Sequence, residues 1–100
     1  MKNSEKSREG FPFHDPENVA VFTCCHVLEQ GAEIRYVCHD EEDGAWQFLC
    51  GGDHDEEDAR IVGLGEIWAR DETVGVLADL PLGWCAERES RGAQWQVWEE

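Results

Sequence analysis

The sequence predicts a small single α+β domain, with an antiparallel or mixed sheet of about five strands and two or three short helices. Three observations lead to this class. Short runs rich in β-branched and aromatic residues recur along the chain, and Gly, Pro, Asp and Ser separate them. Stretches between those runs carry apolar residues at helical spacing. A length of 100 residues suits one domain, and 41% hydrophobic residues with five Trp supply a core.

The N-terminus is expected to lie outside this domain. Residues 1–18 are interpreted as a flexible arm and residues 19–100 as the domain. Residues 1–10 are polar and charged, without the apolar run of a signal peptide. Phe11 and Phe13 follow in an extended segment that contains proline, and their rings are available to dock on the domain.

The first predicted elements are a strand over residues 19–23 and a short helix over residues 24–30. The strand is rich in β-branched and aromatic residues. Thr23 stands at the position where a hydroxyl would cap the start of the helix. Gly31 is placed to end the helix in the left-handed conformation.

A β-hairpin follows, with strands over residues 33–39 and 46–50 and an acidic loop over residues 40–44. Both strands alternate between apolar and polar positions, so each is expected to present one apolar face. The residues expected to pack together on that face are Tyr36, Cys38, Phe48 and Cys50.

The middle of the chain is interpreted as a turn, a strand and two helical segments. Residues 53–58 are acidic and predict a solvated turn, and residues 59–65 predict a short strand followed by a loop. Residues 66–71 and 73–80 have apolar side chains at helical spacing. Pro81 ends this region.

The C-terminal residues predict a second hairpin, with strands over residues 84–88 and 94–98. Trp95 and Trp98 are an odd number of positions apart, so a regular strand places them on opposite faces. One of them is therefore expected to be exposed, and an exposed Trp is a typical anchor of a protein interface.

Charge is the strongest indication of function. The chain has 23 Asp and Glu against 8 Lys and Arg, a net charge of −15. Such a field repels nucleic acid and anionic membrane and attracts a basic protein partner. No stretch is long and apolar enough to cross a bilayer, and a cytoplasmic location is expected. The residues expected to face the partner are Asp40, Glu41, Glu42, Asp43, Asp53, Asp55, Glu56, Glu57 and Asp58, with Trp84 and Trp98 as apolar anchors.

The cysteines are expected to be free core thiols, because their number, five, is odd and a reducing compartment disfavours a disulfide framework. Zinc binding is the alternative interpretation, since zinc prefers Cys and His ligands. No Cys-x-x-Cys or His-x3-His pair is present, so the spacing that usually signals a structural zinc site is missing. The residues considered for zinc are Cys38, His39, Cys50 and His54, with Cys24 or His26 nearby.

Other site chemistry is not indicated. A calcium-binding EF-hand loop that began at Asp53 would need Gly at its sixth position, where the chain has Asp58. The chain also lacks a Gly-x-Ser-x-Gly nucleophile motif, a phosphate-binding glycine loop and a His-Glu-x-x-His motif. We therefore predict no catalytic residue, no metal site and no cofactor.

Three segments carry a resemblance to a known group of proteins: residues 39–52, residues 61–67 and residues 78–84, which include the element Asp-Leu-Pro-Leu-Gly-Trp. Together they resemble a family of small bacterial proteins of unknown function that is associated with predicted immunity proteins of toxin systems. The resemblance covers roughly residues 19–98. It implies fold and lineage, and it brings no catalytic residue.

The sequence as a whole favours a non-catalytic acidic binding protein, of immunity type if the resemblance holds, that covers a basic toxin surface. A toxin that acts on nucleic acid presents such a surface because it binds phosphates. Two alternatives stay open: a zinc-binding structural or enzymatic domain, and a housekeeping domain whose acidic surface only confers solubility. The sequence leaves the oligomeric state open.

Overall fold

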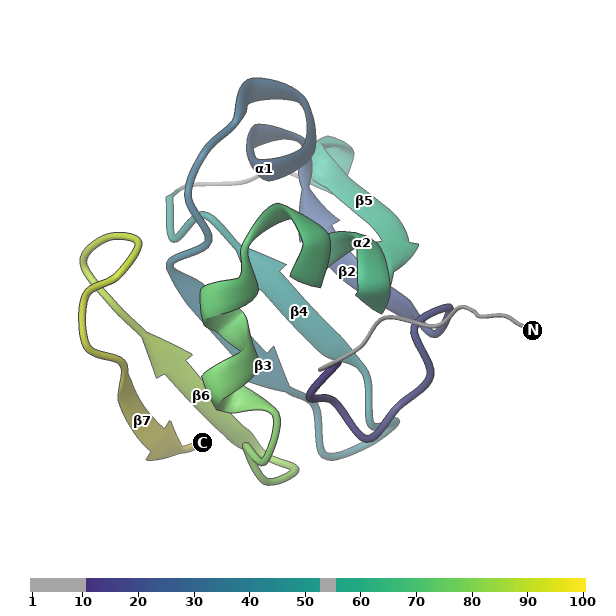
Figure 1. Cartoon of the computed structure of the whole chain (residues 1–100), viewed down its shortest axis with the longest axis vertical. Coiled ribbons are helices and arrows are strands. Elements are labelled where there is room, and N and C mark those ends of the chain that lie inside the picture. Colours follow the sequence, from purple (N-terminus) through teal and green to yellow (C-terminus); the bar gives the residue numbers. More distant parts are fainter. Residues whose placement is uncertain (1–10, 53–55) are drawn as a thin grey trace.

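Six strands form one mixed sheet, and a computed structural model describes the chain over residues 11–52 and 56–100 (Figure 1). The order across the sheet is β5-β2-β4-β3-β6-β7. β2 and β4 run parallel, and the other neighbouring pairs are antiparallel. The α+β class is confirmed, with a mixed sheet of six strands where about five were expected. The strands are β2 (Ala20–Cys24), β3 (Tyr36–His39), β4 (Trp46–Leu49), β5 (Ala59–Gly63), β6 (Trp84–Glu87) and β7 (Gln96–Glu99).

The described residues form four short helices around this sheet. They are α1 (Cys25–Gln30) and α2 (Leu64–Arg70), together with the 3-10 helices η1 (Glu56–Asp58) and η2 (Glu72–Leu77). In Figure 1, α2 and η2 cross in front of the sheet and α1 lies at its upper end. The two predicted helical stretches thus correspond to α2 and η2, although η2 winds as a 3-10 helix.

The start of α1 differs from its prediction. Cys24 and not Thr23 is the N-cap residue, and no side chain caps the helix. β2 continues through Cys24, so Thr23 is buried within the strand and its hydroxyl donates to the carbonyl oxygen of Phe48. The prediction for Gly31 is confirmed, because its φ of 73° lies in the left-handed region.

The hydrophobic core lies between the sheet and the helices. Val21, Val37 and Phe48 contribute from the strands, and Leu64 and Ile67 contribute from α2; all five are fully buried. Neighbouring strands bring these side chains into one layer, since Val37 lies opposite Phe48 in the pairing of β3 with β4. Burial of these side chains is the main source of stability in a domain of this size.

The predicted packing face of the first hairpin is wrong. Tyr36 pairs with Leu49 and Cys38 pairs with Gln47, so Tyr36 and Cys38 point away from the face that carries Phe48. Their neighbour Val37 takes the core position instead. Three successive positions of β3 are Tyr, Val and Cys, so its own alternation does not identify the inner face.

Part of the predicted N-terminal arm packs on the domain. Phe13 is buried, and its ring contacts that of Trp46 edge-on at a centroid distance of 5.3 Å. Phe11 contacts the ring of Trp68 in the same way at 5.6 Å. The two aromatic side chains that were expected to be available for docking therefore close one edge of the core.

Two of the five cysteines are linked. Cys38 of β3 and Cys85 of β6 lie directly opposite in the strand register and form a disulfide. The expectation of free thiols is wrong for this pair, because the strand pairing brings their Cα atoms to 4.2 Å of each other. Cys24, Cys25 and Cys50 form no disulfide with one another or with other described residues.

No helix within the described ranges is long and apolar enough to cross a membrane. The longer α-helix, α2, has 7 residues.

Candidate functional site

The face of the sheet opposite the helices carries one continuous row of side chains that crosses all six strands. Each member is the register partner of the next. In Figure 1, α2 and η2 lie on the other side of the sheet. We call this set the open-face row: Ile61, Phe22, Gln47, Cys38, Cys85 and Trp98.

Large apolar side chains of the open-face row are exposed. The exposed fractions are 65% for Ile61, 41% for Phe22 and 37% for Trp98. Trp98 packs beside Tyr36 with ring centroids 6.1 Å apart. Between these exposed side chains the row contains polar Gln47 and the buried Cys38 and Cys85. Exposed large apolar side chains on one sheet face are typical of an interaction surface.

The two predicted Trp anchors lie in different environments. Trp98 is exposed on the open face, while Trp84 faces the helices, pairs with His39 in the register and packs partly buried against the core. Trp95 is also half-buried and faces the guanidinium of Arg88 at 4.2 Å. Trp98 is therefore the Trp of this hairpin that a partner can reach on the open face.

A hollow of ≈ 280 Å³ opens on this face beside Phe22. Phe22, Leu49 and Ala59 form its apolar wall, and Gln47 and Asp58 add polar groups. Asp58 accepts a hydrogen bond from the Cys25 thiol at 3.5 Å, and a carboxylate has further acceptor capacity. Apolar walls with a carboxylate suit a Lys or Arg side chain, which has an aliphatic stem and a cationic end.

The two acidic runs lie at opposite ends of β4. The loop over residues 40–45 precedes its first residue, and the run over residues 53–58 follows its last. Of the second run, Asp53 and Asp55 lie outside the described residues, and the side chain of Glu56 is likewise not described. Glu57 is exposed and Asp58 is half-buried at the hollow. The described members of the two runs thus lie at opposite ends of β4 and do not form one patch.

Two acids of the first run shape its turn. Asp40 accepts a hydrogen bond from the Glu42 amide at 3.0 Å, and Asp43 accepts one from the Ala45 amide at 2.9 Å. Glu41 lies against Gly83, whose φ is 84°. Glu41 and Glu42 are exposed and make no such hydrogen bond with the loop, so they are the residues of this run whose charge is available to a partner.

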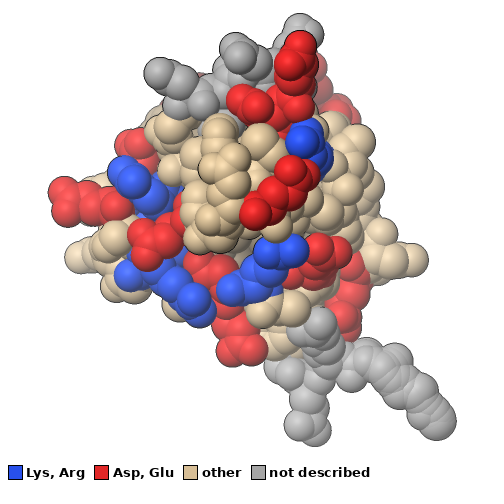
Figure 2. All heavy atoms as spheres, turned by 90° about the horizontal axis from the view of Figure 1, so that it is seen from above, with Lys and Arg blue, Asp and Glu red and all other residues tan. Residues whose placement is uncertain are grey.

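Charge is unevenly distributed between the two ends of the sheet. The end that carries the β3–β4 loop has no Lys or Arg among the described residues. The five Arg of residues 11–100 lie toward the α1 end, where Figure 2 shows them interleaved with carboxylates. Arg60, for example, pairs with Glu29 at 2.8 Å. We call the first region the acidic end: Asp15, Asp40, Glu41, Glu42, Asp43, Asp79, Glu99 and Glu100.

A cluster of soft metal ligands lies where β2 runs into α1. Ligand atoms of Cys24, His26 and Cys50 are all within 4.8 Å of one another, and Cys50 Sγ is 3.7 Å from His26 Nδ1. Cys25 and Asp58 form a second such group with His26. Burial, with the nearby Cys24 thiol, raises the pKa of Cys50, and burial together with Asp58 raises the pKa of Cys25.

The cluster differs from the ligand set that the sequence suggested. Cys38 is in the disulfide with Cys85. His39 stacks on Trp46 at 3.9 Å, and its Nδ1 lies 2.7 Å from the Leu80 carbonyl oxygen. Cys50 does approach Cys24 and His26. His54 lies outside the described residues.

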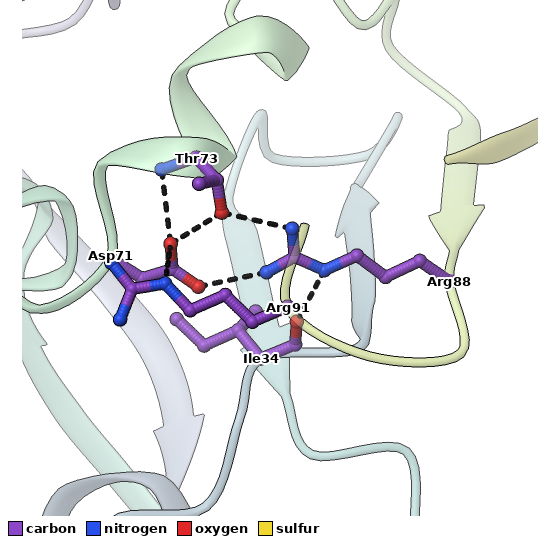
Figure 3. A network of polar contacts seen from close by, with 5 residues as sticks. All are labelled: Ile34, Asp71, Thr73, Arg88 and Arg91. Carbon is purple, nitrogen blue, oxygen red and sulfur yellow. Dashed lines mark hydrogen bonds and ion pairs between the residues drawn. The ribbon is translucent and has the colours of Figure 1, made fainter. Parts of the chain in front are cut away.

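A buried polar network that the sequence did not indicate joins β6 to η2 (Figure 3). The Arg88 guanidinium donates from Nη2 to Asp71 Oδ2 at 2.8 Å, from Nη1 to Thr73 Oγ1 at 2.9 Å and from Nε to the Ile34 carbonyl oxygen at 3.0 Å. Arg91 approaches Asp71 from the solvent side at 3.3 Å. These contacts join the end of β6 to the start of η2, so the network holds the helix layer to the sheet.

Comparisons with protein-family models, with curated proteins and with solved structures found no match to this chain. The fold and the site define a small acidic α+β domain in which the described residues place no helix over the open-face row. The resemblance to the immunity-related family stays a prediction from the sequence.

Proposed function

We propose that this protein is a non-catalytic binding protein whose open sheet face receives a protein partner with a basic surface. The observation that carries the proposal is the open-face row, in which exposed Ile61, Phe22 and Trp98 lie between acidic groups at both ends of β4. An apolar surface with acidic groups at its borders suits a partner with an apolar patch and basic groups around it.

Affinity is expected to come mainly from apolar burial. Trp98 and Phe22 are large and keep 37% and 41% of their surface exposed. Covering each contributes on the order of 1 kcal/mol from area alone. A Lys or Arg of the partner would enter the hollow beside Phe22, laying its stem on Leu49 and placing its charge near Asp58.

Association rate is expected to come mainly from charge. A net charge of −15 over 100 residues produces a long-range field that steers a cationic protein, and salt weakens this steering. The acidic end has no Lys or Arg among the described residues to cancel its field locally. Glu41 and Glu42 are the exposed charges at that end that do not shape the loop.

A toxin that binds nucleic acid is the partner class we propose, because a protein that holds phosphates needs a basic surface. By covering that surface, the open face would block access of nucleic acid without any catalytic step. The sequence resemblance to immunity-related proteins supports this role. The proposal includes a cytoplasmic location, against which the Cys38–Cys85 disulfide weighs, since disulfides are typical of oxidising compartments.

Site-specific photo-cross-linking in the producing cell tests the proposal. A photoreactive amino acid at Ile61, which is 65% exposed on the open face, is compared with one at Val76, which is 75% exposed on the helix side. We expect Ile61 to yield an adduct with a basic protein and Val76 to yield none.

Three results of this experiment would count against the proposal. Equal adducts from Ile61 and Val76 would indicate contacts that are not specific to the open face. An adduct only with a second copy of the chain would indicate a homodimer interface. No adduct from either position would favour a domain whose acidic surface serves solubility alone.

A further inference from the structure

We infer that Cys24, His26 and Cys50 form a binding site for one Zn²⁺ ion at the end of the sheet where β2 runs into α1. This inference is independent of the proposed partner-binding function. It assigns a metal to three side chains that the sequence alone does not bring together.

The strand arrangement is what assembles the three ligands. Cys24 is the last residue of β2, and His26 is the second residue of α1. β2 and β4 are parallel neighbours, and Thr23 of β2 pairs with Phe48 of β4. The C-terminal ends of the two strands therefore lie side by side. Cys50 directly follows β4 and therefore lies beside the turn from β2 into α1.

The separation of two of the ligand atoms is the one that a shared zinc ion requires. Zn–S bonds of about 2.3 Å and Zn–N bonds of about 2.0–2.1 Å at a tetrahedral angle place the two ligand atoms about 3.6 Å apart. Cys50 Sγ and His26 Nδ1 are 3.7 Å apart, and Cys24 Sγ lies within 4.8 Å of both. The Cys50–His26 separation thus matches a shared zinc ion, and the Cys24 thiol lies close enough to be the third ligand.

The chemistry of the set also suits zinc. Two thiolates neutralise the charge of Zn²⁺, which allows the ion to lie where Cys24 is almost fully buried. Zinc binds the deprotonated thiols, so binding is expected to release protons.

Three protein ligands leave one tetrahedral position. His26 and Cys50 line an open hollow of ≈ 450 Å³ that also contains Gln30 and Arg35. Arg35 is exposed. Water or a small anion beside Arg35 is the expected fourth ligand, because a site with three protein ligands keeps its last position open to solvent.

The adjacent Cys25 provides a matched control. It also lies near His26, but its thiol donates to Asp58 at 3.5 Å and belongs to the other group of potential ligands. Replacing Cys25 by Ser changes the same atom as replacing Cys50 by Ser, in a position one residue from Cys24. The site therefore predicts different consequences for two chemically identical substitutions.

The test is a metal titration of the full chain, purified under anaerobic conditions and freed of metal by chelation. Zn²⁺ binding is measured by competition with a chromophoric chelator, and the stoichiometry by native mass spectrometry. We expect one Zn²⁺ per chain, with an affinity that falls by on the order of 100-fold or more in Cys50→Ser and His26→Gln and stays unchanged in Cys25→Ser. Co²⁺ substitution should give thiolate-to-metal charge-transfer absorption in the wild type and in Cys25→Ser only.

Both site variants replace half-buried residues, and circular dichroism checks that each is folded. Absence of stoichiometric Zn²⁺ in the wild type would overturn the inference. Equal affinity in Cys50→Ser and in the wild type would overturn it as well. A peptide that links Cys24 to Cys50 in the anaerobic protein would assign the two thiols to a disulfide instead, and that result also contradicts the site.

Discussion

Arg88 and Asp71 form an ion pair that is withdrawn from solvent. Arg88 Nη2 lies 2.8 Å from Asp71 Oδ2, and the side chains keep only 1% and 6% of their surface exposed. Asp71 is the N-cap residue of η2, and its carboxylate accepts a hydrogen bond from the Thr73 amide. Arg88 directly follows β6. The pair therefore fastens the helix layer to the sheet, with the Trp95 ring packed over the guanidinium at 4.2 Å.

Loss of this pair is expected to be costly. Asp71→Asn leaves the Arg88 charge buried without its counter-ion, which costs about 3–5 kcal/mol of the free energy of unfolding. The matched control is Glu66→Gln, which removes the exposed pair with Arg70 at 3.4 Å and should cost less than about 1 kcal/mol. Urea unfolding followed by circular dichroism measures both. Equal small losses in the two variants would contradict the structural role of the network.

Stability is expected to fall in alkaline solution. Burial raises the pKa of Cys25 above 9.0, burial also raises that of Cys50, and burial raises the pKa of Tyr36 above 10.0. The unfolded chain releases these protons first, so the stability that the protonated groups contribute is present below about pH 9 and is lost as the pH rises further.

Urea unfolding of the metal-free protein between about pH 8 and about pH 10.5 measures this fall. A variant with Cys25→Ala and Cys50→Ala should lose less stability over the same range, because two of the three groups are gone. An increase in stability with pH over this range would be inconsistent with the assigned pKa directions.

Phe22 of β2 lies on the open face, and Phe48 of β4 lies on the core face. Substitution of each should therefore affect a different property, binding for Phe22 and stability for Phe48. Phe48 is fully buried in the core, and Phe48→Ala should cost about 3–5 kcal/mol of the free energy of unfolding. Phe22 is 41% exposed, so Phe22→Ala should lower the free energy of unfolding by only about 1 kcal/mol. The same substitution should lower the affinity for the partner identified by cross-linking by tenfold or more. Unfolding curves and binding isotherms report the two effects. Unchanged affinity in folded Phe22→Ala would remove the hollow from the interface.

Charge at the acidic end should control the association rate. Glu41→Lys with Glu42→Lys reverses two exposed charges without removing the hydrogen bonds that Asp40 and Asp43 make in the loop. We expect the association rate constant with the cross-linked partner to fall roughly tenfold at low salt, with a weaker salt dependence.

The control variant carries Glu33→Lys and Glu89→Lys, which reverse two charges as well. Both residues are exposed on loops toward the α1 end. This variant should have a smaller effect on the association rate in stopped-flow measurements. A rate that depends only on the total charge, with no difference between the two ends, would contradict steering by the acidic end.

Local sequence signals predicted the elements of this fold well. Gly31 ends α1 as expected, and the acidic loop before Trp46 joins the two strands of a hairpin. These features depend on residues close in sequence, whose conformational preferences are read directly from residue type. Which face of β3 is inside was not predictable, because Tyr36, Val37 and Cys38 are all apolar and only the register selects Val37.

The candidate sites depend on long-range pairing, and for this reason the sequence predicted them only in part. It indicated an exposed Trp in the last hairpin, and Trp98 is exposed. Cys50 meets Cys24 because β2 and β4 are parallel neighbours, a pairing that no local pattern reveals. Burial of Arg88 was equally hidden, since a charged residue after a strand usually faces solvent.

Side-chain footprinting of the open face tests the central claim most directly. Hydroxyl-radical oxidation of Phe22 and Trp98 is measured in the free protein and in the complex with the partner obtained through Ile61, with exposed Val76 on the helix side as the internal reference. We predict that binding slows oxidation of Phe22 and Trp98 and leaves that of Val76 unchanged. Protection of Val76 with unchanged oxidation of Phe22 and Trp98 would contradict the account, because the partner would then occupy the helix side.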